Sequence, residues 1–214
     1  MNFQFNGAIF DADGTLLNSM HIWKELGQRF LKGLNIEPEK NLWKILYPMS
    51  LEQSSEYLLK KYKLNFSVDE IQEGILKIIE EFYVNEVKLK AGVKNFLEAL
   101  KLKNIPMVIA TSGDRNLLKA ALKRNGIEDY FEEIFTCSEL NTTKHASKIF
   151  IACSEFLKLE PKDIAVFEDS LFAIRTAKEA GFLTVGVEDD SNIFQREEII
   201  YSSDYYIKTF EGEI

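Results

Sequence analysis

The sequence contains few of the residues that mark several common classes of protein. Its 214 residues include two cysteines, two histidines and four prolines. Cys137 and Cys153 do not have the spacing of metal-binding cysteine pairs, so we expect buried free thiols rather than a disulfide or a zinc site. Prolines this sparse mark no linker between domains, and no repeat or low-complexity tract interrupts the chain.

Positive charge and long apolar runs are also scarce. Lys and Arg number 26 against 34 Asp and Glu, which gives a net charge of −8 and argues against nucleic acid as the main partner. No run approaches the ~20 apolar residues of a membrane span. The first residues lack the basic and apolar regions of a signal peptide. We therefore expect a cytoplasmic monomer with no membrane partner.

Two carboxylates directly follow the first apolar segment. Residues 8–10 predict a short buried strand, and Gly14 predicts the turn after it. Asp11 and Asp13 then lie at the carboxyl end of that strand, where charges are costly to hold unless a cation compensates them. A calcium loop is excluded, because Leu16 and Ile22 occupy the positions that require Gly and Glu. A solvated turn remains an alternative at this point.

Residues 18–86 have a helical pattern. Apolar residues from Leu16 to Phe30 recur near helical spacing and predict a helix that ends at Gly33. Ser50 opens a second predicted helix, and Ser67 begins a capping-box pattern before a third. No strand is predicted here, so we expect a helical insertion, 18–86, in a core formed by residues 1–17 and 87–214.

Apolar strands and helices alternate from residue 92 onward. The further predicted strands cover residues 106–111, 133–136, 164–167, 183–187 and 204–207. Predicted helices between them cover residues 93–102, 117–124, 147–157 and 171–180, the last with Ser170 as its cap. This alternation predicts an α/β fold, with a Rossmann-like doubly wound parallel sheet as its core and the helical insertion as a cap domain.

Polar side chains follow two more of the predicted strands. Thr111 and Ser112 lie at the end of the second strand, and Glu168 and Asp169 follow the fourth. In a strand order of 3-2-1-4-5, the second and fourth strands flank the first. Ligands of such sheets bind beyond the carboxyl ends of the strands, where the order reverses. We therefore expect these residues to converge with the two acids of the first strand.

This set of residues suits the binding and transfer of a phosphoryl group. Asp11, Asp169 and Glu168 offer hard oxygen ligands that favour Mg²⁺ over a soft metal. The Thr111 hydroxyl and the amides after it can bind phosphate oxygens. Lys144, in a loop before a helix, can neutralise both the acids and the phosphate. An aspartate can attack phosphorus to give an acyl-phosphate, and a carboxylate two residues on can act as acid and base.

These residues resemble the four motifs of the haloacid dehalogenase-like (HAD) superfamily of phosphatases, in the same order and over nearly the whole chain. They are Asp11-Ala12-Asp13-Gly14-Thr15, Thr111-Ser112, Lys144 and Glu168-Asp169. The chain is most similar to the β-phosphoglucomutase-like branch, which inserts a helical cap between the first two motifs. The resemblance implies a Rossmann-like core with a mobile cap, and Mg²⁺-dependent phosphoryl transfer through a phospho-aspartate.

The resemblance also implies a role for each motif residue. Asp11 corresponds to the nucleophile and a metal ligand, and Asp13 to the general acid and base, whose carbonyl group also binds the metal. Asp169, with Glu168 beside it, completes the implied metal site. The implied phosphate-binding residues are Thr111, Ser112 and Lys144.

The chain also departs from the pattern of the family. Residues 144–150 read Lys-His-Ala-Ser-Lys-Ile-Phe, where the family usually has Lys-Pro-x-Pro-Asp-x-Phe. Trp23 and Leu51 align with a His and an Arg that serve the mutase cycle, which favours a phosphatase over a mutase. The acid at Asp13 argues against the dehalogenating members, which lack one there.

We therefore expect a Mg²⁺-dependent phosphatase that acts on a small phosphorylated metabolite, with a sugar phosphate as the favoured class. A phosphomutase is the alternative within the enzymes. A receiver-like signalling module is a further alternative, although receivers carry their paired acids and phospho-acceptor on different strands. The sequence does not name the substrate, and it leaves open whether His21, His145 and Arg115 contact it.

Overall fold

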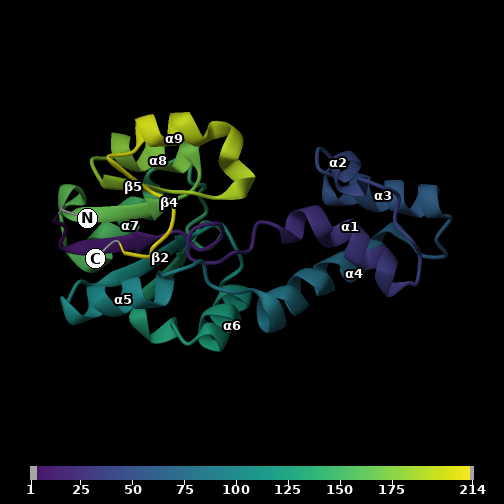
Figure 1. The fold of residues 1–214 in the computed structure, drawn as a ribbon, viewed down its shortest axis with the longest axis horizontal. Coiled ribbons are helices and arrows are strands. Elements are labelled where there is room, and N and C mark those ends of the chain that lie inside the picture. The colour runs from purple at the N-terminus through teal and green to yellow at the C-terminus, as the bar shows by residue number, and fades with distance from the viewer. Residues whose placement is uncertain (1–3, 213–214) are drawn as a thin grey trace. The chain divides into compact units, whose positions relative to one another are not determined.

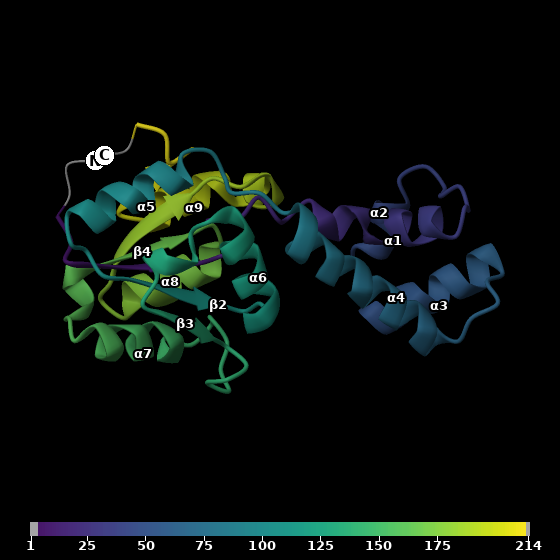
Figure 2. The ribbon, with the colours of Figure 1, turned by 90° about the horizontal axis from the view of Figure 1, so that it is seen from below.

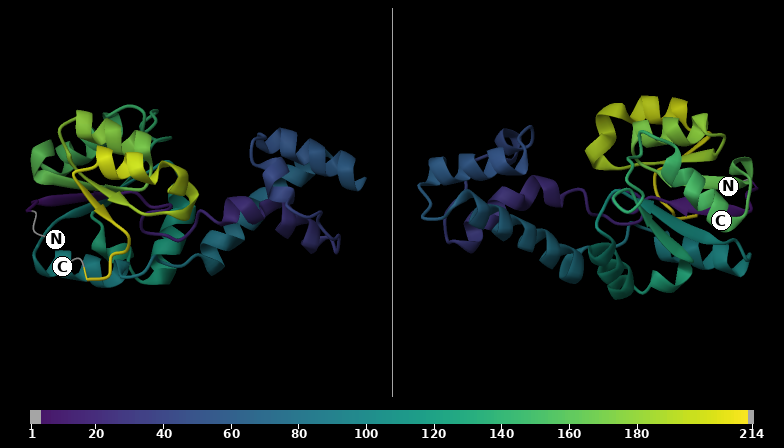
Figure 3. Two further views of the ribbon diagram at one scale, coloured as in Figure 1. Left: turned by 45° about the horizontal axis from the view of Figure 1, so that its top comes forward. Right: turned by 180° about the vertical axis from the view of Figure 1, so that it is seen from behind.

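The computed structural model describes residues 4–212 and divides into two compact units. The first comprises Met1–Ser19 with Val87–Ile214, and the second comprises Met20–Glu86. The chain therefore passes between them twice (Figure 3). We call them the core unit and the helical unit. The helical unit begins two residues after the start of the predicted insertion, 18–86.

A six-stranded parallel sheet forms the centre of the core unit, with the strand order β3-β2-β1-β4-β5-β6 (Figure 1). The strands are β1 (Gly7–Phe10), β2 (Met107–Thr111), β3 (Glu133–Thr136), β4 (Ile164–Glu168), β5 (Leu183–Val187) and β6 (Tyr205–Ile207). The predicted fold class and the predicted order of the first five strands are confirmed. The order reverses at β1, which lies between β2 and β4.

Helices cover both faces of this sheet. The α-helices of the core unit are α5 (Val93–Leu102), α6 (Arg115–Asn125), α7 (Lys148–Leu157), α8 (Leu171–Glu179) and α9 (Arg196–Ser202). Short 3₁₀ helices are η2 (Glu128–Tyr130), η3 (Pro161–Asp163) and η4 (Asp190–Gln195). Figure 2 shows α5 and α7 on opposite sides of the sheet. Strands covered on both faces are apolar along their length, and the residues of β1, β2 and β4 are all buried.

Aromatic packing fixes β1 against β4 on the α5 side of the sheet. The rings of Phe10 and Phe167 stack with their centroids 4.5 Å apart. Phe96 of α5 packs edge-on against both rings, and Phe210 packs against Phe96. Burial of each such side chain stabilises the fold by about 1.5–3 kcal/mol. The carboxyl ends of β1 and β4, where the predicted acids lie, are therefore held next to each other.

The helical unit has a small apolar core of its own. Its helices are α1 (Ile22–Gly33), α2 (Leu42–Leu46), α3 (Leu51–Tyr62), α4 (Val68–Glu81) and the π-helix η1 (Phe82–Glu86). Ser50 and Ser67 form the capping boxes of α3 and α4, so both predicted helix starts are confirmed. The buried side chains of this core are Phe30, Leu31, Leu42, Leu58, Ile71 and Ile75.

Three local predictions are wrong. The helix predicted from Leu16 begins only at Ile22, because Leu16 and Leu17 are buried in the core unit instead: their N–H groups bond to Ala12 O, and Leu17 also bridges to Leu89. Ser170 precedes α8 without a side-chain cap. The helix predicted over residues 117–124 begins at Arg115. Neither α2 nor η1 was predicted.

Gly92 lies where the backbone leaves no room for a side chain. Its φ is +82°, and a Cβ there would lie 2.4 Å from Glu211 N and 2.5 Å from Phe210 C. Both are backbone atoms, so a rotamer change cannot relieve the overlap. We predict that Gly92→Ala destabilises the protein by more than the ~1–2 kcal/mol that a left-handed φ alone costs, measured by denaturant unfolding.

Gly181→Ala is the matched control for this prediction. Gly181 also lies in the core unit with a positive φ of +88°, but the nearest atom to its Cβ position would be Pro161 Cβ at 3.9 Å. That distance is ordinary van der Waals contact, so Gly181→Ala should lose only the unfolding free energy that a left-handed φ costs. Equal losses of unfolding free energy in the two variants would contradict the argument from close packing.

Within residues 4–212, no helix is both long and apolar enough to cross a lipid bilayer.

Candidate active site

Three carboxylates meet at the carboxyl ends of β1 and β4. Asp11 follows β1, Glu168 ends β4 and Asp169 follows it. One oxygen from each lies within 4.8 Å of those from the other two. The three residues are 7%, 1% and 2% exposed, respectively. The first and fourth strands therefore bring together the acids that the sequence analysis selected, and we call these three residues the acid cluster.

Lys144 connects two members of the acid cluster. Its ammonium group donates to Asp11 Oδ1 and, at 2.7 Å, to Glu168 Oε2. The lysine side chain is only 4% exposed, although the loop that carries it, residues 141–147, lacks the prolines typical of the family. The structure thus places Lys144 where its charge acts on both carboxylates.

Burial and mutual repulsion alter the proton affinities of these groups. Burial, with the nearby charge of Glu168, raises the pKa of Asp11 to about 8, although Lys144 opposes the shift. Burial and the charges of Glu168 and Asp11 also raise the pKa of Asp169. Burial lowers the pKa of Lys144, but the charges of Asp11 and Glu168 outweigh it and raise that pKa overall. The raised pKa values of Asp11 and Asp169 show that Lys144 alone does not offset the burial and mutual repulsion of the three carboxylates.

The donor set of the acid cluster fits a hard divalent cation. Mg²⁺ prefers carboxylate oxygens over nitrogen or sulfur, and the three acids supply only oxygen. They are buried, and among residues 4–212 Lys144 is the one ammonium group paired with them, so a further positive charge would offset the repulsion. Asp11, Glu168 and Asp169 are the residues that would hold such an ion.

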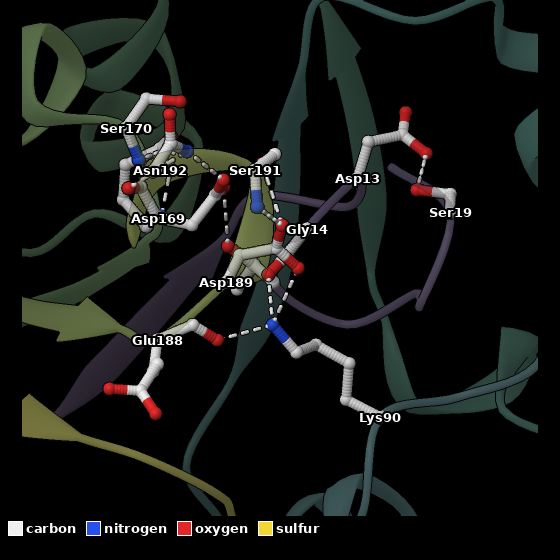
Figure 4. Close-up of polar contacts among 12 residues, drawn as sticks. Asp13, Gly14, Ser19, Lys90, Asp169, Ser170, Glu188, Asp189, Ser191 and Asn192 are labelled. Carbon is white, nitrogen blue, oxygen red and sulfur yellow. Dashed lines mark hydrogen bonds and ion pairs between the residues drawn. The ribbon is translucent and has the colours of Figure 1, made fainter. Parts of the chain in front are cut away.

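Asp13 points away from the acid cluster. Figure 4 shows its side chain turned from Asp169 toward Ser19, whose hydroxyl donates to Asp13 Oδ1 at 2.6 Å. A Cβ built on Gly113 would lie 3.2 Å from Asp13 Oδ2 and 3.3 Å from Thr111 Oγ1. The Asp13 carboxylate and the Thr111 hydroxyl therefore both lie beside Gly113, in the loop that follows β2.

The predicted phosphate-binding hydroxyls lie at the end of β2 and in the loop after it. Thr111 is buried and its Oγ1 accepts from Gly113 N at 2.9 Å. Ser112 is exposed, with its Oγ 3.5 Å from Cys137 Sγ. Asp114 then caps α6 by accepting from Asn116 N and Leu117 N. This cap explains why α6 starts at Arg115, two residues earlier than predicted.

Three residues that the sequence left open make local contacts in the structure. Arg115 forms ion pairs with Glu133 and Glu139. His145 stacks on Phe172 with the ring centroids 4.3 Å apart. In the helical unit, His21 packs edge-on against the Phe82 ring.

Several residues around Asp169 were missed by the sequence analysis. Asn192 Nδ2 donates to Asp169 Oδ2 at 2.7 Å, and Thr15 Oγ1 donates to Asp169 Oδ1 at 3.2 Å. Lys90 donates to Gly14 O at 2.6 Å (Figure 4). Thr15 lies within the first motif and was named there without a role. No local sequence pattern marks Asn192 or Lys90, because their partners Asp169 and Gly14 lie 23 and 76 residues away.

The helical unit contains an apolar pocket of about 430 Å³. Trp23, Tyr47 and Leu51 are among its lining residues, together with Trp43 and Met49. Trp23 and Leu51 are the positions that the resemblance aligned with a His and an Arg of the mutase cycle. The pocket wall supplied by these positions is apolar and does not offer those two polar groups.

The chain is similar in sequence to known hydrolases. The sequence model described as haloacid dehalogenase-like hydrolase matches residues 8–187. A phosphatase of phosphorylated carbohydrates from Thermotoga maritima is 24% identical over 173 residues, covering 81% of this chain and 80% of the relative. A Clostridium perfringens protein named as a pyrophosphatase is 32% identical over 184 residues, covering 84% and 82%.

The fold also matches a solved structure. A Thermotoga maritima protein described as a β-phosphoglucomutase superimposes with a TM-score of 0.84. The match covers 96% of this chain and 95% of the other at 22% identity. Identity at this level supports the shared fold, including the inserted helices.

Proposed function

Because the chain belongs to the haloacid dehalogenase-like hydrolase family, we propose that it is a Mg²⁺-dependent phosphatase that transfers the phosphoryl group of a small metabolite to Asp11 and then to water. The observation that carries this proposal is the acid cluster with Lys144 bound to two of its members. Such a cluster, buried at the reversal point of a parallel sheet, combines a cation site with a nucleophile.

The proposed first step forms a bond between an Asp11 carboxylate oxygen and phosphorus. The bond from phosphorus to the leaving-group oxygen breaks, and the Asp13 carboxyl group donates a proton to that oxygen. The Thr111 and Ser112 hydroxyls and the Lys144 ammonium group bind the phosphoryl oxygens. Asp11, Glu168 and Asp169 would hold a divalent cation, which would supply positive charge to offset that of the phosphoryl group.

The second step regenerates the enzyme. A water molecule attacks phosphorus while the Asp13 carboxylate accepts its proton, and the bond from phosphorus to Asp11 breaks. The products are inorganic phosphate and the free Asp11 carboxylate, so Asp13 ends with the proton it needs for the next cycle. The position of Asp13 outside the acid cluster, beside Gly113 of the loop after β2, supports this double role.

A phosphorylated sugar is the proposed substrate class, and the helical unit is the proposed cap. The name of the Thermotoga maritima relative, a phosphatase of phosphorylated carbohydrates, supports this class of substrate. The apolar wall at Trp23 and Leu51 supports hydrolysis over a mutase cycle, for which the sequence lacks the aligned His and Arg.

The proposal is tested by a screen of phosphorylated metabolites in which inorganic phosphate is measured. We expect the protein to release phosphate from at least one sugar phosphate in the presence of Mg²⁺. Chelation with EDTA should lower the rate at least about tenfold, because the metal supplies several kcal/mol of charge stabilisation. Restored Mg²⁺ should restore the rate. Release that continues unchanged in EDTA would contradict the role given to the acid cluster.

A further inference from the structure

Asp169 is held by two loops that come from different parts of the core unit. From the loop after β1, Thr15 Oγ1 donates to Asp169 Oδ1 at 3.2 Å. From the loop after β5, Asn192 Nδ2 donates to Asp169 Oδ2 at 2.7 Å and to Asp169 O at 3.3 Å. Each carboxylate oxygen therefore has a donor from a different loop, and the orientation of the carboxylate depends on the relative position of the two loops.

The first of these loops packs tightly against Asp169. Gly14 has a φ of +84°, and a Cβ there would lie 2.6 Å from Asp169 Oδ2. The backbone of Gly14 is thus close to the carboxylate itself. A small displacement of this loop would change both the Gly14 contact and the Thr15 hydrogen bond.

Lys90 binds both loops at once. Its ammonium group donates to Gly14 O at 2.6 Å in the first loop (Figure 4). It also donates to Glu188 O at 2.5 Å and to Asp189 Oδ2 at 2.9 Å in the second. These three acceptors match the three donors of an ammonium group. The Lys90 and Asp189 side chains are only 15% and 7% exposed, so their ion pair is largely shielded from water.

Asp189 extends this connection toward Asn192. Its Oδ1 accepts from Ser191 N at 2.9 Å and from Ser191 Oγ at 2.6 Å. The carboxylate thus fixes the turn that leads into η4 (Asp190–Gln195). Asn192 lies in η4. Burial raises the pKa of Asp189, but the Ser191 hydrogen bonds and the Lys90 charge outweigh it and lower that pKa overall.

We propose that Lys90 is a positioning residue for the reaction: it cross-links the two loops that hold Asp169 and so fixes this carboxylate for the divalent cation. This inference rests on the proposed function. Within residues 4–212, no hydrogen bond or ion pair joins Lys90 to the acid cluster. Lys90 acts through Gly14 and through Asp189. Partners that orient metal ligands in this way typically affect metal affinity or activity by about 10–100-fold.

Lys90→Met tests this inference, because methionine keeps an unbranched chain and removes all three donors. We expect the Mg²⁺ dissociation constant, measured by titration calorimetry, to rise about 10-fold or more, and kcat at a fixed Mg²⁺ concentration to fall by a similar factor. KM for the phosphorylated substrate should change little. Asp189→Asn keeps an acceptor for Ser191 but removes the ion pair. It should also weaken Mg²⁺ binding, by a smaller factor than Lys90→Met.

Lys178→Met is the matched control. Lys178 Nζ forms an ion pair with Asp204 Oδ1 at 2.9 Å, in the core unit and outside the acid cluster. This variant should keep the Mg²⁺ affinity and kcat of the wild type.

The double variant Lys90→Met, Asp189→Asn should bind Mg²⁺ only slightly more weakly than Lys90→Met alone, because the two residues act through the same ion pair.

The outcomes separate this inference from the proposed function. If Lys90→Met and Asp189→Asn both bind Mg²⁺ as the wild type does, the positioning role of Lys90 is wrong, while phosphate release by the wild type still supports the proposed function. If the wild type releases no phosphate, the proposed function is wrong. Calorimetry then still shows whether Lys90 controls Mg²⁺ binding. Circular dichroism identifies any variant that fails to fold, and the milder Asp189→Asn then decides the result.

Discussion

Asp11→Asn will reduce phosphate release by at least about a thousandfold, which corresponds to about 4 kcal/mol of transition-state stabilisation. An amide oxygen is a poor nucleophile toward phosphorus, and the substitution also removes one of the three charges of the acid cluster. The measurement is the rate of inorganic phosphate release from the best substrate of the metabolite screen, with Mg²⁺ present.

The asparagine variant should remain folded. The substitution preserves the size of a side chain that is only 7% exposed, and it relieves repulsion from Glu168, which contributes to the raised pKa of Asp11. We therefore expect the thermal unfolding midpoint of Asp11→Asn to equal or exceed that of the wild type without Mg²⁺. A folded variant that retains the wild-type rate would remove Asp11 from the role of nucleophile.

Asp13→Asn will slow turnover by about 100- to 10,000-fold on a substrate with an alkoxide leaving group, as expected for loss of a general acid and base. With p-nitrophenyl phosphate the leaving group needs no proton, so the first step should proceed and the second should still lack its base. We therefore expect a rapid release of p-nitrophenolate, equal to the enzyme concentration, followed by a slow steady rate.

Ser19→Ala is the control for the Asp13 variant. It removes the hydroxyl that donates to Asp13 Oδ1 but keeps the carboxylate that transfers the proton. The loss of turnover should be much smaller than in Asp13→Asn, and no burst of p-nitrophenolate should appear. Equal loss of activity on alkyl and p-nitrophenyl substrates in Asp13→Asn, with no burst, would contradict the proposed proton transfer.

Much of the fold and of the acid cluster was predictable because its signals are local. The apolar segment before Asp11 and the one before Glu168 each predict a buried strand, and parallel strands place their carboxyl ends at one edge. The starts of α3 and α4 follow from short capping boxes at Ser50 and Ser67. In each case the residues that determine the structure lie within a few positions of one another.

The missed features depend on contacts between distant segments. Leu16 has the spacing of a helical residue, but burial in the core unit decides its conformation, and α1 begins six residues later. Lys90 looks like an ordinary solvated lysine in the sequence, whereas its acceptors at Gly14 and Asp189 lie 76 and 99 residues away. Asn192 likewise reaches Asp169 only because β4 and β5 are neighbours in the sheet.

The role of Asp11 is tested most directly by mass spectrometry of peptides from Asp13→Asn, quenched in acid during the slow phase of p-nitrophenyl phosphate turnover. We expect one phosphoryl group on the peptide that contains Asp11, present with Mg²⁺ and absent from the Asp11→Asn, Asp13→Asn double variant. A phosphoryl group on another residue, or an unmodified Asp11 peptide while phosphate is still released, would show that Asp11 does not accept the phosphoryl group.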